Sequence, residues 1–415
     1  MPTSLARALG ILAATALLPA ALAESDNEAT ARQVRAFLEA RVKSDPQDNV
    51  ALNRLANEYL RALRVSGDLA YIEKSVHAAK QSLESVPAQE NKNALTALGR
   101  GQLEQHRFAD CRDTAQQLIS LSPEAAIGQQ LLGDALFELG RYSEADAAFA
   151  ELSRLDDRGI PSKTRLARVA WFHGDKKTSL DLLSQAIALA ADDGEASRTN
   201  LAWAEMKSGE VCFQSGDFDR ADEFYAKAAA HNPDYWVIAE HIAELRAAQE
   251  KWPEAVQGFQ AVIARVPRPE MEQALGDVYS AWGKPEEAAP HWQRAKEGYL
   301  QSIARGEIFF RHHLASFFAD SEENPPEAIR WAKRDLEDRQ SAAAWDALAW
   351  AQYKNNNFTE AAATEEKALA LGSKEPHITF HAGMILLATG DDRGRLLLKD
   401  LAAVNPRFNS FHVHR

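Results

Sequence analysis

Residues 131–149 read LLGDALFELGRYSEADAAF, two apolar segments joined by a turn at Gly140. Apolar residues recur every three or four positions on each side of that glycine, which is the period of an amphipathic helix. Small residues stand at Gly133 and Ala145, and an aromatic residue follows at Phe149. Small side chains let two helix backbones approach closely, and the aromatic ring fills the space beside them. The stretch therefore predicts a helix–turn–helix hairpin.

This arrangement repeats along the chain at a nearly constant period. The second small residue follows the first by 12 positions and the aromatic by 16, and two further copies are Gly209, Ala221, Tyr225 and Gly276, Ala288, Trp292. The second small position recurs at Cys111, Ala145, Ser179, Ala221, Ala255, Ala288, Ala328, Ala361 and Arg395. Six of these eight intervals lie within one residue of 34. A fixed period of this length predicts stacked two-helix units that share one continuous core.

The pattern resembles the tetratricopeptide repeat family, whose unit is a helix–turn–helix of 34 residues. The resemblance is clear in residues 236–267 and 345–368, and it extends over roughly residues 90–408. It implies an all-α fold, a right-handed α-solenoid of about ten helix–turn–helix units. No sustained alternation of apolar and polar residues occurs, so we expect almost no β-structure.

Two intervals are longer than the period. The 42-residue step has extra residues around 187–200, including Asp192, Asp193 and Gly194, and the 40-residue step has extra residues around 297–307 or 320–326. Both predict a lengthened helix or a projecting loop. The acidic insertion is the only feature that would favour an enzyme, and its spacing fits no calcium-binding loop.

The first 23 residues have the three parts of a secretory signal peptide. Arg7 supplies the positive charge, Leu9 to Leu22 is almost wholly apolar, and residues 21–23 read ALA. A membrane anchor is the alternative, but the apolar run is shorter than the ~20 residues that a spanning helix needs. We expect an exported protein, periplasmic or secreted, with no stable membrane anchor after cleavage. The remaining chain divides into a helical cap and divergent repeat (24–88), the solenoid (89–408) and a histidine-containing tail (409–415).

Composition narrows the function classes. The 415 residues include 47 Lys+Arg and 60 Asp+Glu, a net charge of −13, which argues against nucleic acid as a partner. Two cysteines, Cys111 and Cys212, are too few for a disulfide scaffold or a cysteine-rich zinc site. The sequence contains no recognisable catalytic motif. We therefore expect a non-enzymatic protein without a cofactor. Its oligomeric state is not predicted.

A partner-binding groove is expected on the inner face of the superhelix, because the family lines that face with the first helix of each unit. Applying the family's spacing to each unit selects aromatic and acidic side chains. The predicted groove comprises Asp134, Phe137, Trp171, Glu210, Phe213, Glu240, Glu244, Asp277, Phe317, Asp346, Trp350 and Tyr353. The hypothesis is a scaffold of the cell envelope that binds a protein or peptide segment in an acidic, partly aromatic groove. The alternative for each aromatic is packing between helices.

Histidines gather toward the C-terminus and suggest a second function. His377 and His381 are spaced i, i+4, so both can lie on one helix face, and His412 and His414 follow in the tail. Imidazoles in this arrangement can bind a transition metal. The alternative hypothesis is therefore a periplasmic metal-binding or metal-handling protein that uses these four residues. Ordinary surface histidines are the competing interpretation.

Overall fold

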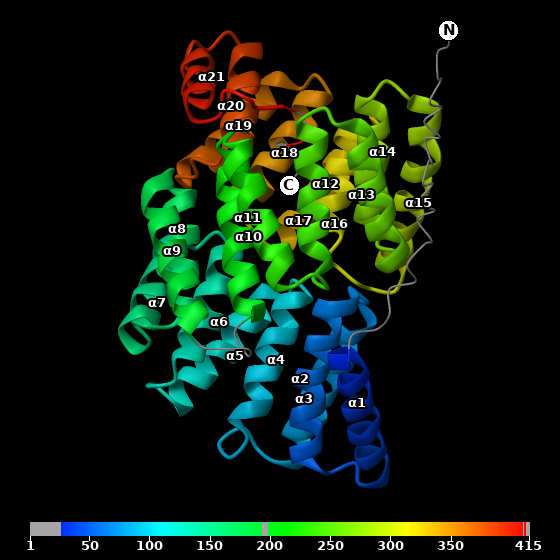
Figure 1. Cartoon of the computed structure of the whole chain (residues 1–415). Helices are drawn as coiled ribbons and strands as arrows, with labels where there is room; N and C mark the ends of the chain where they lie inside the picture. The colour runs from blue at the N-terminus through cyan, green and yellow to red at the C-terminus, as the bar shows by residue number, and fades with distance from the viewer. Residues whose placement is uncertain (1–25, 193–197, 410, 412–415) are drawn as a thin grey trace, which may run out of the picture.

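The structure, a computed structural model, describes residues 26–192, 198–409 and 411. Every regular element in these ranges is a helix (Figure 1). A single helix, α1 (Asp26–Ser44), precedes ten sequential helix pairs. No helix in the described ranges is long and apolar enough to span a bilayer. The predicted all-α solenoid of about ten two-helix units is therefore confirmed.

Each pair has a first helix and a second helix that run antiparallel. The first five pairs are α2 (Asn49–Ser66) with α3 (Ala70–Ser85), α4 (Lys92–Glu104) with α5 (Phe108–Leu121), α6 (Ala126–Glu138) with α7 (Tyr142–Leu155), α8 (Ile160–Phe172) with α9 (Lys176–Asp192), and α10 (Arg198–Gln214) with α11 (Phe218–His231). The last five are α12 (Trp236–Ala248) with α13 (Trp252–Arg265), α14 (Pro269–Ala281) with α15 (Pro285–Ala304), α16 (Arg311–Ser316) and the π-helix η2 (Phe317–Ser321) with α17 (Pro325–Asp338), α18 (Ala342–Lys354) with α19 (Phe358–Ala370), and α20 (Pro376–Ala388) with α21 (Arg393–Val404).

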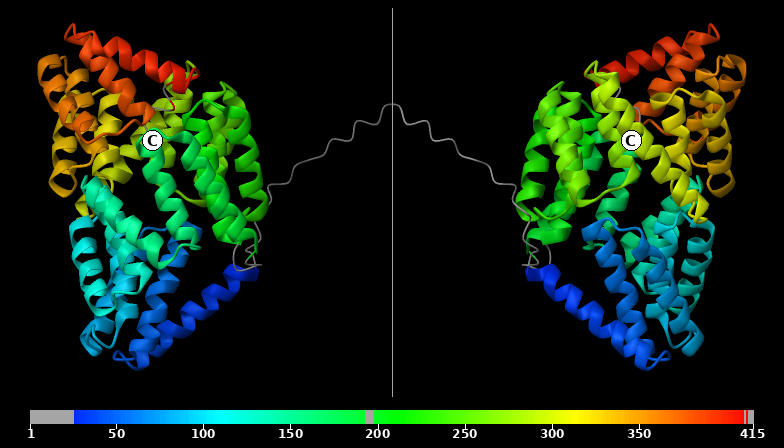
Figure 2. Two further views of the ribbon diagram at one scale, coloured as in Figure 1. Left: turned by 90° about the vertical axis from the view of Figure 1, so that its left-hand side faces the viewer. Right: turned by 90° about the vertical axis from the view of Figure 1, so that its right-hand side faces the viewer.

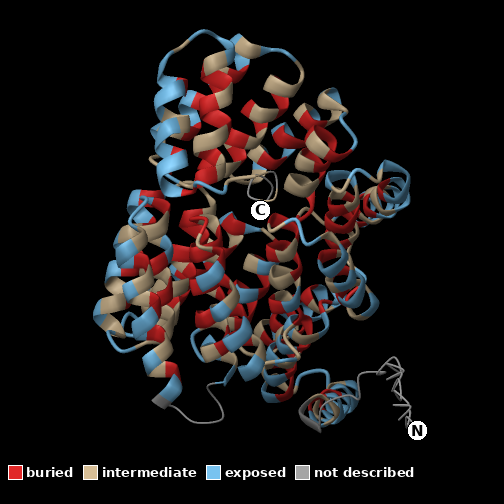
Figure 3. Ribbon diagram, turned by 45° about the horizontal axis from the view of Figure 1, so that its top comes forward, coloured by how far each residue is buried: buried red, intermediate tan, exposed pale blue. Residues whose placement is uncertain are grey.

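The repeated glycine and aromatic residues pack directly on each other. A Cβ atom placed on Gly133, Gly209 or Gly276 would lie 2.4 Å from the ring of the aromatic residue 16 positions later. Only glycine therefore leaves room for a ring at this crossing. Figure 3 shows the result, with buried residues gathered where helices face each other and exposed residues on the outer sides. Cys111 and Cys212 are also buried as free thiols, and burial raises the pKa of Cys111 to about 12.

The two long intervals in the repeat lengthen helices. The second helix α15 has 20 residues, against 14 in α13, so the extra residues add more than a turn to it. Both α9 and α10 have 17 residues, which accounts for most of the other insertion. Asp193 and Gly194 lie outside the described residues, as does the whole predicted signal peptide (1–23). The predicted cap and divergent repeat correspond to α1, α2 and α3.

The solenoid completes one turn in about 200 residues and then packs against itself. The Ala342 amide donates to the Tyr142 hydroxyl across 200 residues of sequence (2.9 Å), and the Lys374 amide donates to the Phe172 carbonyl (2.8 Å). Further along, the Asn405 side-chain amide donates to the Gln214 carbonyl (3.0 Å). Figure 2 shows the later helices, yellow to red, above the blue and cyan ones, with the yellow helices next to them and the red ones farthest away.

These contacts follow one rule. The turn that joins the two helices of an early pair contacts a loop that joins two successive pairs, about six pairs further along the chain. Glycines allow the approach, since a Cβ on Gly67, Gly140 or Gly216 would fall within 2.4 Å of Val266, Gln340 or Asn405, respectively. Successive turns of the solenoid therefore touch, and the binding surface is sought in the cavities on its inner side.

Candidate functional site

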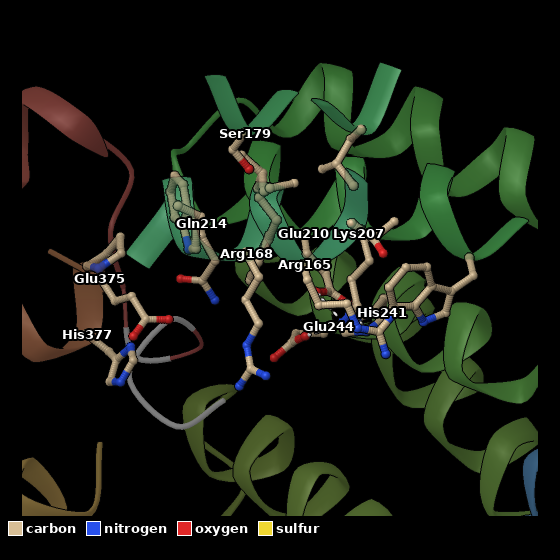
Figure 4. Close-up of a pocket in the computed structure, with 18 of the residues that line it drawn as sticks. Arg165, Arg168, Ser179, Lys207, Glu210, Gln214, His241, Glu244, Glu375 and His377 are labelled. Atoms are coloured by element: carbon tan, nitrogen blue, oxygen red, sulfur yellow. Dashed lines mark hydrogen bonds and ion pairs between the residues drawn. The ribbon is translucent and has the colours of Figure 1, made fainter. Parts of the chain in front are cut away.

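A cavity of about 580 Å³ lies on the inner side of the solenoid, between α6, α8, α10 and α12 of the first turn and the start of α20 in the second. We call it the Trp171 cavity. Figure 4 shows Glu375 and His377 on one side of it, Lys207, Glu210 and His241 on the other, and Arg168 between them. Its volume lies in the range of ligand-binding clefts.

A charged network forms one wall of the Trp171 cavity. The Glu210 carboxylate accepts from Lys207 Nζ (2.8 Å) and lies 3.1 Å from His241 Nε2, while His241 Nδ1 lies 3.4 Å from Glu244 Oε2. Burial opposes the charge on Glu210, but Lys207 and His241 outweigh it and hold the pKa of Glu210 at about 2. Burial likewise opposes the charge on His241, but the two glutamates raise its pKa to about 10. At neutral pH this wall is therefore a self-paired network of two cations and two anions.

Two arginines of α8 neutralise further acids. Arg165 forms an ion pair with Asp134 (2.8 Å), and Arg168 pairs with Glu138 (2.5 Å) while its guanidinium lies 3.9 Å from the centre of the Phe137 ring. Such pairing satisfies the carboxylates from within the protein. The carboxylates that the sequence predicts for this surface are therefore largely neutralised at the cavity by neighbouring cations.

The predicted groove residues separate into three groups. Five line the Trp171 cavity: Asp134, Trp171, Glu210, Phe213 and Glu244. Phe137, Glu240, Asp277, Trp350 and Tyr353 line neither this cavity nor the second one described below. Phe137 lies beneath Arg168, Asp277 accepts from Trp292 Nε1 (2.8 Å), and the rings of Trp350 and Tyr353 stack at 4.9 Å.

Phe317 and Asp346 form the third group, which is buried in the core. Phe317 is fully buried with Tyr299, Phe310 and Trp331 in the largest apolar cluster. Asp346 is 3% exposed and lies 2.8 Å from His381 Nδ1. The inner-face spacing selects both, but each packs against helices of its own or a neighbouring unit and not toward a cavity. We therefore correct the predicted groove by removing these two residues.

The predicted metal ligands are not brought together. His377 is half-buried and lines the Trp171 cavity, whereas His381 is buried, contacts Asp346 and stacks on Trp350 at 4.0 Å between ring centres. Within the described ranges, no three or more His, Cys, Asp or Glu side chains gather as a metal site. His412 and His414 lie outside those ranges. The metal hypothesis stays a prediction for the tail.

Sequence reasoning missed the basic residues that line the cavities. Lys207 and His241 lie one helical turn from the selected Glu210 and Glu244, and Arg165 lies on the first helix that follows the one carrying Asp134. A search for acid–base pairs along first helices and between neighbouring ones would have found all three. Arg64 and Arg268 gave no such signal, because the former ends α2 and the latter precedes α14. Only the winding of the superhelix brings these two around one cavity.

Comparison with known proteins agrees with the repeat geometry. Residues 96–159 and 321–391 match the family model of the tetratricopeptide repeat. These two stretches are therefore similar to tetratricopeptide repeats. Proteins built from this repeat are generally non-enzymatic scaffolds that bind protein partners. No curated protein matches the sequence.

Several solved structures are similar to parts of this chain. A thermophilic tetratricopeptide protein of Thermus thermophilus is 22% identical, with 48% of this chain and 98% of that chain covered and a TM-score of 0.40. A tetratricopeptide repeat protein of Parabacteroides merdae is 16% identical (59% and 93% covered, TM-score 0.40). Yeast Tom70 is 12% identical (86% and 92% covered, TM-score 0.37).

Proposed function

We propose that this protein is an exported scaffold that holds a segment of a partner protein in the Trp171 cavity. The supporting observation is the pair of half-buried indoles, Trp171 and Trp203, which line a cavity whose charged residues are largely paired among themselves. Tryptophans that are partly open to a cavity are the side chains that most often dominate binding between proteins. Because the surrounding charges already have partners, an apolar side chain can enter without leaving a charge unpaired.

The choice of a polypeptide partner follows from charge and repeat type. A net charge of −13 opposes nucleic acid, and tetratricopeptide proteins typically bind proteins. The cavity is formed by helices from two turns of the solenoid, so its shape depends on how the turns meet. A partner that bridges both turns would therefore also stabilise their contact.

Replacing Trp171 with alanine is expected to weaken capture of the partner by at least ~30-fold, the usual effect of removing a central tryptophan. The measurement is recovery of crosslinked partner from native envelopes by the purified mature chain. Trp282→Ala is the matched control, because Trp282 lies at the end of α14, lines neither cavity and rests under Lys284. Equal recovery with both variants, at equal helical circular dichroism, would refute the role of the Trp171 cavity.

Export with cleavage of the signal peptide predicts a defined N-terminus for the mature protein. The mature protein recovered from the envelope should begin at Glu24, because residues 21–23 fit the small-residue cleavage pattern. Intact mass spectrometry measures this directly. A mass that includes residues 1–23 would contradict the proposed signal peptide and favour the membrane-anchor alternative.

A further inference from the structure

A second and larger cavity, of about 880 Å³, lies on the inner side toward the N-terminal end of the solenoid. We call it the Arg100 cavity. It is enclosed by α2, α4 and α6 and by the segments that begin α8, α10, α12, α14 and α16. Its wall includes five arginines and two carboxylates: Arg61, Arg64, Arg100, Arg165, Arg268, Glu104 and Asp134. A positively charged wall is unexpected in a chain whose net charge is −13.

Part of this positive charge has no carboxylate partner within the described part of the protein. Arg165 is paired with Asp134, and Arg268 is paired with Glu270. Arg64 and Arg100, by contrast, form no ion pair with any described residue. The polar contact of Arg100 is the Asn57 side-chain oxygen, at 3.4 Å. Both residues are exposed in part, and both line the cavity.

The environment of the cavity favours an incoming anion. Burial in the cavity wall and the nearby charges of Arg64 and Arg165 lower the pKa of Arg100. The positive charge of Arg100 is therefore not balanced by a neighbouring anion. Burial also raises the pKa of Glu104 against the opposing effect of Arg64 and Arg268. A cleft that carries one sign of charge between walls of low polarity concentrates ions of the opposite sign.

Backbone hydrogen-bond donors also lie at the wall of this space. Trp236 is one of the wall residues, but its indole nitrogen is buried and has no partner among the described residues, so it is not counted as a donor to the cavity. Four first helices, α8, α10, α12 and α14, begin at the wall. Their N-terminal amides add partial positive charge to that of the arginines. The helix N-termini and the unpaired guanidinium groups of Arg64 and Arg100 therefore both favour a negatively charged ligand.

We infer that the Arg100 cavity binds an acidic segment of polypeptide through its side-chain carboxylates. This inference rests on the proposed scaffold function and names the chemistry of the partner. The two cavities share Asp134, Thr164, Arg165 and Trp203, so one segment can place an apolar side chain near Trp171 and acidic side chains near Arg64 and Arg100.

A polypeptide fits the cavity better than a compact anion. The unpaired cations are distributed over two helices, α2 and α4, instead of converging on one point. Apolar residues lie between them in the wall, including Leu60, Leu63 and Pro161. A chain with alternating acidic and apolar side chains can satisfy both kinds of surface, whereas a phosphate group would satisfy only the arginines.

The test uses a fluorescent hexaglutamate peptide with an acetylated N-terminus and an amidated C-terminus, so that only side-chain carboxylates can bind. Fluorescence anisotropy with the purified mature chain is expected to show binding that weakens as salt rises. Hexalysine of the same length should not bind. Arg64→Gln/Arg100→Gln is expected to weaken hexaglutamate binding ~10-fold or more, because two charge-assisted contacts are lost. Inorganic phosphate at equal charge should compete poorly.

The matched control is Arg54→Gln/Lys92→Gln, which removes two exposed cations from the same two helices without touching either cavity. It should change the affinity less than 2-fold. Equal losses in both double variants would overturn the inference, because binding would then depend on overall charge alone. Absence of hexaglutamate binding to the wild type at low salt, or effective competition by phosphate, would also overturn it.

The proposed function is tested separately. If the partner is lost with Trp171→Ala but retained with Arg64→Gln/Arg100→Gln, the scaffold function stands and the acidic segment is rejected.

Discussion

Replacing Gly140 with alanine is expected to separate the two turns of the solenoid and to destabilise the protein by about 3 kcal/mol. Gly140 has φ +76°, and a Cβ atom there would lie 2.2 Å from the Gln340 carbonyl oxygen and 3.0 Å from Ser341 Cα. Both obstacles are backbone atoms of the facing turn, so no side-chain rotation relieves the clash. Urea unfolding followed by circular dichroism measures the loss of stability, and small-angle X-ray scattering should show an expanded molecule.

Gly283→Ala separates the two causes of this effect. Gly283 has the same φ of +76° and the same place in its pair, but a Cβ atom there would meet nothing within 4 Å. Only the left-handed backbone is then penalised, at a cost of about 1 kcal/mol, without expansion of the molecule. If both variants lose the same stability and keep the same radius of gyration, the contact between turns contributes nothing measurable.

Acidification from pH 7 to pH 5 is expected to lower the free energy of unfolding by up to about 4 kcal/mol through His106 and His312. Their rings stack at 5.4 Å between centres where the α4–α5 turn meets α16. Burial and nearby Arg339 lower the pKa of His106 to about 3, and burial with His313 lowers the pKa of His312 as well. The unfolded chain therefore binds protons below pH 6.5 while the folded chain does not, so stability falls from there toward pH 3.

The double variant His106→Asn/His312→Gln should flatten this pH dependence. Asparagine suits position 106, because His106 has φ +58° and asparagine tolerates that backbone. His77→Gln, at an exposed position of α3, should leave the slope unchanged. Urea denaturation at pH 7 and pH 5 provides the comparison. An unchanged slope in the double variant would reject this pair as the cause.

His241 acts in the opposite sense. The pKa of His241 is raised to about 10, so its stabilising contribution is complete below pH 6.5 and is lost as pH rises toward 10. Its contribution cannot therefore account for a loss of stability in acid.

The order of helices could be predicted because its signals are local. Gly133, Ala145 and Phe149 meet within one hairpin, so their spacing records their contact. The prediction of the groove residues succeeded in part for the same reason, because it also used spacing within one helix. Trp171, Glu210 and Phe213 lie on first helices that do face a cavity. Phe317 has the same register but packs into the core, since α16 continues into a π-helix there.

The helical pair, its 34-residue period and the small residues that let helices cross are readable from the sequence, because they depend on contacts between residues close in the chain. Which turns touch, where the cavities lie and which charges remain unpaired in them depend on the tertiary structure. Tyr142 meets Ala342, and Arg64 and Arg268 line one cavity, through the summed rotation of about six units. Each unit contributes a small angle set by packing at its interface, and no residue pattern within a single repeat specifies the total.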